Sequence, residues 1–292
     1  MSVILHHRYV APTLSRAVAM LALLTVPLSA HAQTAQPLDL NGASKTVSAP
    51  VPAPAPPRVP ANRQWRGVYI GGFIGSAQGE SHLQTTTVFS STGYFATTSP
   101  PAIITAGNQT LDTSDTEYGG LAGYNIQVGR VIVGGEGDFS SMGLSGSVTS
   151  GNAYPCCPTT SFSIQQSIDT TWFASVRLRG GFTFGRAMVY GTYGMAWTDL
   201  NYQAVFTDTF ANAHENGGLD NIQSAPVWGA GAEFWLSRHL TVKGEYLNTE
   251  FEPAATTSSN LTAGGVAYPS NVFTHSSTLK LQLFRGGVIW RF

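Results

Sequence analysis

The sequence predicts an all-β protein of eight antiparallel strands, and three observations carry this prediction. Beyond Gln64, short stretches rich in Gly, Val and aromatic residues alternate with Ser/Thr-rich stretches, and none sustains a helical period. Along the apolar stretches, apolar and polar side chains alternate, which is the period of a strand. Only 11 % of the residues are charged, against roughly 25 % in an ordinary soluble domain. The chain therefore carries too little charge to cover a large surface exposed to water.

Two segments precede the predicted strands. Residues 1–32 carry Arg8 and Arg16, an apolar stretch at 17–28 and small residues before a cleavage point after Ala32, which is typical of a secretory signal peptide. Residues 33–64 are rich in proline, which fixes φ and removes an amide donor, so we expect a disordered, extended leader. The predicted domains are thus a signal peptide (1–32), a Pro-rich leader (33–64) and a β domain (65–292).

Three tight-turn candidates divide the β domain at regular intervals. Arg130, Arg186 and Arg238 each lie in a short turn, and Arg291 follows at a similar spacing. The repeating unit is a strand, a long loop, a strand and a tight turn, so four such hairpins make eight strands. The predicted strands span residues 65–78, 116–127, 131–144, 171–184, 187–205, 225–236, 240–251 and 278–292.

Charged residues recur on one face only of these strands. In residues 171–184, Trp172, Val176 and Phe182 share one face, whereas Arg177 and Arg179 share the other. The residues of the charged face are Glu136, Asp138, Arg177, Arg179, Glu233, Lys243, Glu245 and Arg285.

The alternation alone fits a soluble sandwich with charges outward or a membrane barrel with charges inward. Sparse charge, aromatic residues near strand ends and the preceding signal peptide favour the inverted arrangement, in which an apolar band faces lipid. We therefore predict an eight-stranded antiparallel up-and-down transmembrane β-barrel with long extracellular loops and short periplasmic turns. Its place is the outer membrane of a Gram-negative bacterium, and the Pro-rich leader is periplasmic.

The last predicted strand ends in alternating apolar residues and an aromatic carboxyl terminus, an ending that the outer-membrane insertion machinery recognises. This predicted insertion signal consists of Val288, Trp290 and Phe292. The leucines within residues 279–283 have the opposite parity, so we expect a bulge or a glycine kink near Gly286.

Several motifs occur together in the β domain. Residues 65–72 read WRGVYIGG, 171–181 read TWFASVRLRGG, 189–196 read VYGTYGMA and 242–247 read VKGEYL. In combination they resemble the small outer-membrane β-barrel proteins of the porin family, the opacity-like surface antigens. The resemblance covers residues 65–292 and implies an eight-stranded barrel that serves envelope integrity and surface interaction. It also implies, for scattered members, porin and haem-binding roles, and it supplies no catalytic residue.

The charged face holds four acids and four bases. An eight-stranded barrel has an interior just wide enough for its own side chains, so these residues would lie in the lumen. Paired charges spare each other the cost of burial alone. We therefore expect a structural ion-pair network that closes the lumen, and the alternative is a narrow porin-like channel lined by the same residues.

The predicted long loops contain acids but no Lys or Arg. Because carboxylates and phosphates both supply the oxygen ligands of Mg²⁺ and Ca²⁺, we expect the outer face to contact outer-membrane lipid and lipopolysaccharide through divalent cations. Simple solvation of the loops is the alternative, and a loop-mediated adhesin or haem-binding receptor is a second functional alternative. The acids in and beside these loops are Glu80, Asp112, Asp115, Asp169, Asp208, Glu215, Asp220 and Glu252.

Other chemistry has little support in the sequence. A net charge of −1 without a basic cluster argues against nucleic-acid binding. Cys156 and Cys157 could form a loop disulfide with each other or stay free, but two adjacent thiols make no metal site. His275 and the pair His214 and Glu215 fall in predicted loops, and adjacent residues on a strand face opposite ways. We expect no enzyme, no cofactor and no metal.

Overall fold

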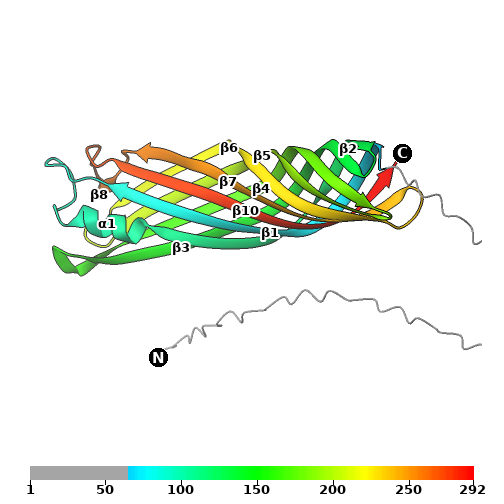
Figure 1. Cartoon of the computed structure of the whole chain (residues 1–292). Helices are drawn as coiled ribbons and strands as arrows, with labels where there is room; N and C mark the ends of the chain where they lie inside the picture. Colours follow the sequence, from blue (N-terminus) through cyan, green and yellow to red (C-terminus); the bar gives the residue numbers. More distant parts are fainter. Residues whose placement is uncertain (1–64) are drawn as a thin grey trace, which may run out of the picture. The chain divides into compact units, whose positions relative to one another are not determined.

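The computed structural model describes residues 65–292 (Figure 1), so the predicted signal peptide and leader lie outside the described residues. Two short strands, β8 (Thr262–Ala263) and β9 (Val266–Ala267), and the helix α1 (Ser99–Gly107) accompany eight long strands. The long strands are β1 (Gly67–Thr87), β2 (Gln109–Val128), β3 (Val131–Tyr154), β4 (Cys157–Phe184), β5 (Ala187–Asp208), β6 (His214–Trp235), β7 (Leu240–Ser258) and β10 (Phe273–Arg291).

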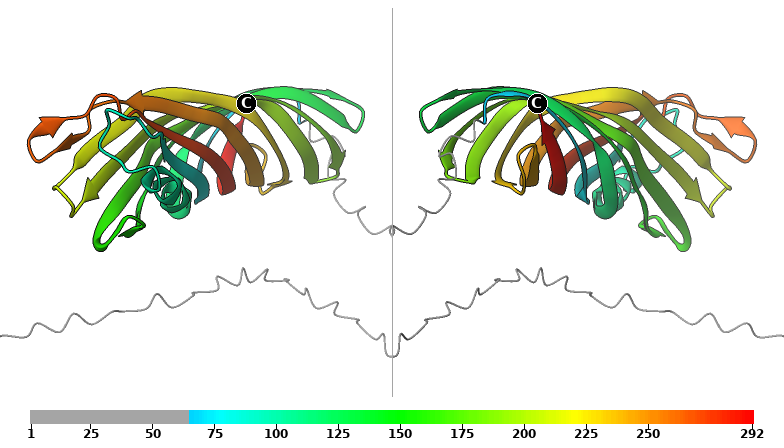
Figure 2. Two further views of the ribbon diagram at one scale, coloured as in Figure 1. Left: turned by 90° about the vertical axis from the view of Figure 1, so that its left-hand side faces the viewer. Right: turned by 90° about the vertical axis from the view of Figure 1, so that its right-hand side faces the viewer.

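The eight long strands close into a ring. The strands pair antiparallel in the order β5, β4, β3, β2, β1, β10, β7, β6, and the pairing of β5 with β6 completes the circle. The prediction of an eight-stranded up-and-down barrel is therefore confirmed. Helix α1 and the β8–β9 hairpin lie at the end opposite to the C-terminus, as the side and end views show (Figures 1 and 2).

The predicted tight turns follow β2, β4 and β6. In the first two, Gly129 and Gly185 have φ values of +61° and +62°, a left-handed conformation that favours glycine. These turns lie at the C-terminal end of the barrel, which is the periplasmic end because short turns of single-chain barrels lie there.

The outer surface carries an apolar band between two aromatic belts. At the periplasmic end, exposed rings include Phe184, Phe234 and Trp290. Further along the barrel, the ring of Phe139 stacks on Trp172 with 6.0 Å between centroids. Aromatic residues prefer the two membrane interfaces, so the belts mark where the barrel crosses the bilayer.

The strands continue well past the second belt, and the predicted loop boundaries are wrong in this respect. Each long strand extends beyond its predicted bound at the extracellular end. The extension is smallest in β5, at three residues, and largest in β4, at fourteen. Outward side chains there are polar, whereas inward ones form a large apolar core. The Ser/Thr-rich sequence hid these strand extensions because their polar residues face water.

The leucines near the carboxyl terminus belong to this core. The pairing of β10 with β1 runs without interruption through Gly286 and Gly287, so the expected bulge there is absent. Leu279, Leu281 and Leu283 point inward and are buried. Their parity opposes that of Val288 because the barrel interior changes from charged to apolar, not because the strand slips.

Beyond the second belt the ring divides into two four-stranded sheets. β2 pairs with β3 only between residues 118–128 and 131–141, and β6 pairs with β7 only between 227–235 and 241–249. The sheets β3-β4-β5-β6 and β7-β10-β1-β2 enclose the apolar core. Near this division, the pairing of β4 with β5 has a register shift between Asp169 and Phe173. There the Asp199 carboxylate accepts hydrogen bonds from the Thr171 and Trp172 amides, at 2.8 and 3.1 Å.

Helix α1 closes the extracellular end. It was not predicted, because its nine residues lie in a segment without helical period. Ile103 and Ala106 pack into a second apolar cluster with Phe95, Phe206 and Phe273. Within residues 65–292, no helix is long and apolar enough to cross a membrane.

Truncation of Leu281 should loosen the extracellular sheets and leave the membrane ring intact. We expect Leu281→Ala to cost about 2–5 kcal/mol of stability, because it leaves a cavity in a closed core. Limited proteolysis in nanodiscs should then cleave the extracellular half faster, while migration of unheated protein on gels stays that of a folded barrel. The neighbouring variant Gln282→Ala, at a half-buried position outside the apolar core, is the control; equal cleavage of both variants would contradict the inward core.

Candidate functional site

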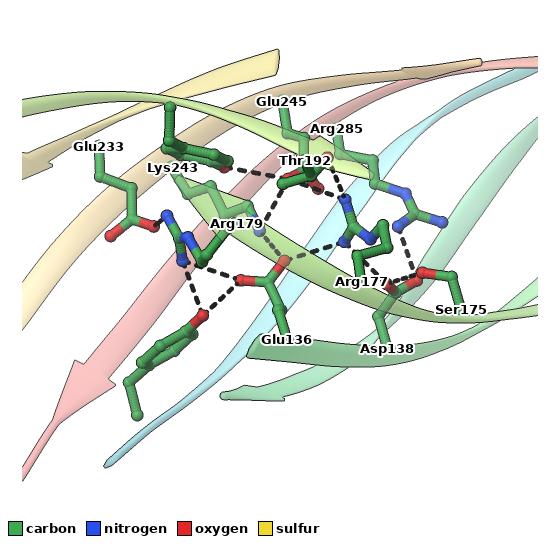
Figure 3. Close-up of polar contacts among 12 residues, drawn as sticks. Glu136, Asp138, Ser175, Arg177, Arg179, Thr192, Glu233, Lys243, Glu245 and Arg285 are labelled. Atoms are coloured by element: carbon green, nitrogen blue, oxygen red, sulfur yellow. Dashed lines mark hydrogen bonds and ion pairs between the residues drawn. The ribbon is translucent and has the colours of Figure 1, made fainter. Parts of the chain in front are cut away.

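The charged residues converge on one layer inside the membrane part of the barrel (Figure 3). All eight predicted lumen residues are buried there, and each forms an ion pair with at least one other charged residue. We call this layer the lumen network. Its ionic members are Glu117, Glu136, Asp138, Arg177, Arg179, Glu233, Lys243, Glu245, Arg285 and Arg291.

Glu136 lies at the centre of the lumen network. Its carboxylate accepts hydrogen bonds from Arg177 Nη2 at 2.9 Å, Arg179 Nη1 at 3.1 Å and Lys243 Nζ at 2.5 Å. The Tyr69 hydroxyl donates a fourth bond at 2.9 Å. Three bases from β4 and β7 therefore converge on one acid of β3, and its side chain is fully buried.

The other acids extend these contacts around the ring. Asp138 pairs with Arg177 Nη2 and Arg285 Nη1 at 2.8 and 2.7 Å. Glu245 pairs with Arg177 Nη1 and Lys243 Nζ at 3.0 and 3.2 Å. Five acids and five bases thus offset one another in a region that neither water nor lipid solvates.

Four members of this layer escaped the sequence prediction. Glu117 holds Arg285 in a fork, with 2.7 Å to Nε and 2.9 Å to Nη2, and Arg291 pairs with Glu233. The inward parity of both residues was a usable signal. The other two are tyrosines: Tyr69 donates a hydrogen bond to Glu136, and Tyr190 donates one to Glu245. Tyrosine occurs on both faces of a membrane strand, so the residue type alone did not indicate a place in this layer.

Glycines make room for these tyrosines. A Cβ atom at Gly123 would lie 2.3 Å from the Tyr69 hydroxyl, and one at Gly231 would lie 2.4 Å from the Tyr190 hydroxyl. The guanidinium of Arg179 lies over the Tyr190 ring, 3.9 Å from its centroid. Glycine opposite tyrosine therefore lets each ring lie against the wall beside an arginine.

Apolar layers bound the lumen network on both sides. On the periplasmic side Trp65 is fully buried, 5.2 Å from Trp235 between ring centroids, and the Arg291 guanidinium lies 4.9 Å from the Trp65 ring. On the extracellular side, Phe173 and Leu283 begin the core of the two sheets. Side chains therefore fill the barrel over these three layers.

A smaller polar cluster joins the two extracellular sheets. His275 contacts Thr85 Oγ1 through Nδ1 at 2.9 Å and Glu215 Oε1 through Nε2 at 3.2 Å. These residues lie on strands and are fully buried, so their predicted loop positions are wrong. The order of hydroxyl, imidazole and carboxylate resembles a nucleophile with its base, but no substrate reaches it, and the contacts link β1 and β10 to β6.

The predicted acidic outer face is only partly correct. Asp208 and Glu215 are buried and hydrogen-bonded, because their strands extend beyond the predicted limits. The thiols of Cys156 and Cys157 are free and lie at the extracellular end, 2.8 Å apart. Within residues 65–292, no three His, Cys, Asp or Glu side chains gather closely enough to hold a metal ion.

Comparison with known proteins places the chain in a family. The model of the outer membrane protein beta-barrel domain matches residues 42–292. The chain belongs to this family. The 31 kDa outer-membrane immunogenic protein of Brucella melitensis is 32 % identical over 133 residues, which cover 44 % of this chain and 51 % of that protein. The matched part thus spans about half the length of this relative.

Two further similarities cover more of the chain. The 25 kDa outer-membrane immunogenic protein of Brucella melitensis is 25 % identical over 244 residues, 82 % of this chain and 85 % of that protein. The crystal structure of OprG from Pseudomonas aeruginosa aligns with 79 % of this chain and 98 % of that one, at 9 % identity and a TM-score of 0.40. The family match and the Brucella relatives show that the protein is an outer-membrane barrel of a Gram-negative bacterium.

Removal of one partner from the lumen network should destabilise the barrel strongly. We expect Glu136→Ala to cost about 3–5 kcal/mol, because Arg177, Arg179 and Lys243 lose their shared acid in a buried site. Urea unfolding in lipid vesicles measures this change. The substitution Glu80→Ala, at a partly exposed side chain outside the lumen, is the control, and equal midpoints for the two variants would refute the central role of Glu136.

Proposed function

We propose that this barrel is a structural protein of the cell envelope that also presents a surface for interaction outside the cell. One observation carries the structural part: all eight ring strands contribute to the lumen layer, through the ionic residues of six strands and through Tyr69 of β1 and Tyr190 of β5. The layer links the strands across the lumen as well as around the wall. Such cross-bracing supports a load-resisting role in the membrane.

The same layer argues against the channel alternative. The side chains of its ion pairs are at most 5 % exposed, so they offer no water-lined path to an ion. Trp65 and Trp235 add an apolar obstacle on the periplasmic side. The geometry therefore supports a structural role for a closed barrel better than it supports a channel.

Planar-bilayer recording and envelope assays test this proposal together. We expect the wild-type protein to give no discrete conductance steps, and we expect cells lacking it to become more sensitive to detergents. Expression of Glu136→Ala, which weakens the cross-bracing, should restore resistance less well than the turn variant Arg130→Ala. Discrete steps with wild-type protein, or unchanged detergent resistance without it, would overturn the structural role.

We also infer that the outer face just above the extracellular belt contacts lipopolysaccharide. Register pairs Glu80 with Asp112 and Lys280, and Lys280 with Glu250, which gives a row of charges across four strands. A surface cleft of about 320 Å³ lies along this row. Lys280 suits a phosphate directly, and the acids suit one bridged by Mg²⁺ or Ca²⁺.

Lipopolysaccharide retained by the purified protein should depend on this row. We expect EDTA to lower it several-fold in the wild type, and we expect Lys280→Glu to lower it before any chelator is added. The periplasmic turn variant Arg238→Glu controls for net charge. If Lys280→Glu and the control retain equal amounts, the outer row does not bind lipopolysaccharide.

The predicted insertion signal remains a proposal for the barrel's assembly partner. Val288, Trp290 and Phe292 face outward at the periplasmic belt, where an insertion machine could read them as one apolar stripe. A disulfide between Cys156 and Cys157 remains the alternative to the free thiols of this structure.

A further inference from the structure

A small pocket opens at the extracellular end of the barrel. Three loops meet there: the segment before α1, the turn between β3 and β4, and the turn between β5 and β6. The pocket encloses about 190 Å³. Its walls are formed by Tyr94, Phe95, Ala96, Ser99, Tyr154, Cys156, Cys157 and Phe210.

Asp208 holds these loops together from beneath. Its Oδ2 accepts hydrogen bonds from the hydroxyls of Tyr94 at 2.6 Å and Tyr154 at 2.8 Å. Its Oδ1 accepts bonds from the amides of Ala211 at 3.3 Å and Ala213 at 2.8 Å. One buried carboxylate therefore fixes two aromatic walls and the adjoining turn, and the pocket is preformed.

The two tyrosines act as permanent donors to Asp208. Burial and the hydrogen bond to this carboxylate raise the pKa of Tyr94 and the pKa of Tyr154 well above the usual value for a phenol. Both hydroxyls therefore keep their protons at physiological pH. Because their polar ends are occupied by Asp208, the rings offer mainly apolar surface to the pocket.

The walls are backed by packed rings. Phe95 lies 5.6 Å from Phe206 and 5.8 Å from Phe273 between centroids, within the apolar cluster of the extracellular end. Phe210 forms the outer rim, 6.2 Å from Tyr94, and is 58 % exposed. Phe210 therefore extends the apolar lining of the pocket to the outer surface.

The segments around the pocket carry few exposed side chains that could recognise an ion. Residues 81–111, 139–168 and 253–279 contain no Asp, Glu, Lys or Arg, and Asp208 and Glu215 are buried. The exposed side chains of His214 and Asp220 belong to β6 and do not line the pocket. Further apolar side chains on the loops of this end are exposed, and we call them the apolar collar. The collar consists of Val88, Phe89, Val266 and Val272.

We propose that the pocket receives one uncharged apolar side chain, aromatic or branched aliphatic, from a partner protein outside the cell. The pocket is smaller than the roughly 300–1,000 Å³ clefts that hold drug-sized molecules, so it suits a single anchor. Buried anchors in pockets dominate the energy of protein interfaces, and surrounding apolar contacts exclude water. The collar supplies those contacts, which a small free ligand would leave unused. This inference rests on the surface-interaction part of the proposed function and names its partner's chemistry.

The thiols of the pocket provide a direct readout. With the full chain reduced and placed in nanodiscs, alkylation of Cys156 and Cys157 by N-ethylmaleimide is followed by mass spectrometry. The probes are N-acetylphenylalaninamide, N-acetyllysinamide and an uncharged Ser/Thr/Gly peptide with one central Phe. We expect the apolar amide and the peptide to slow alkylation at least threefold, and we expect the lysine amide to have no effect.

Variants separate the pocket from the collar. Phe210→Ala should abolish protection by both apolar probes, whereas Phe89→Ser should weaken protection by the peptide alone. The turn variant Arg186→Ala at the far end of the barrel is the matched control. Heat-modifiable migration on gels reports that each variant is folded, and Asp208→Asn should lower protection through loss of the preformed walls.

Three results would overturn the proposal. The first is equal protection by the apolar and lysine amides, and the second is protection that persists in Phe210→Ala. The third is protection by the free amide but not by the peptide, which would indicate a small-molecule site. Conductance and detergent resistance are measured separately on the same protein. A negative alkylation result therefore leaves the structural role intact, and a negative result in those two assays leaves the pocket proposal intact.

Discussion

Hydrocarbon offers no partner to a backbone N–H or C=O group, and the rest of this structure depends on that constraint. Eight strands satisfy it by closing into a ring, which removes every free edge within the membrane. Closure of so few strands leaves a narrow interior that its own side chains must fill. Charges placed there lose their water, so they persist only as a balanced set, and the lumen network provides five acids with five bases.

Above the extracellular belt the constraint is lifted, and the architecture changes accordingly. Water satisfies the backbone edges there, so the ladders between β2 and β3 and between β6 and β7 end, and two sheets separate. Water also reverses the preferred polarity: polar residues face out, and Leu281 and its neighbours face in. In the membrane half, the lumen network joins the opposite walls of the barrel. In the extracellular half, the apolar core joins them.

The sequence was sufficient to predict the ring, its turns and the eight lumen charges, because glycine turns and a period of two are local signals. It was insufficient where the surroundings change along one strand. Leu279 and Val288 were out of phase in the sequence because a single polarity was assumed for the whole of β10, although both keep one register against β7. Asp208 and Glu215 seemed to be loop acids because burial outside the membrane depends on partners distant in sequence, such as Tyr94 and His275.

The reversal of polarity explains how one register is selected. A slip of one residue would turn Arg177 toward lipid and the leucines of β10 toward water, so both halves of the barrel oppose it. A slip of two residues preserves the faces, and only specific pairs resist it. Those pairs lie in the lumen network, where Arg177 of β4 pairs with Glu136 of the adjacent β3, and Lys243 of β7 pairs with Glu136 across the lumen. The apolar band thus determines which face points outward, and the paired charges fix the alignment of β3 with β4 and the height of β7 relative to both across the lumen.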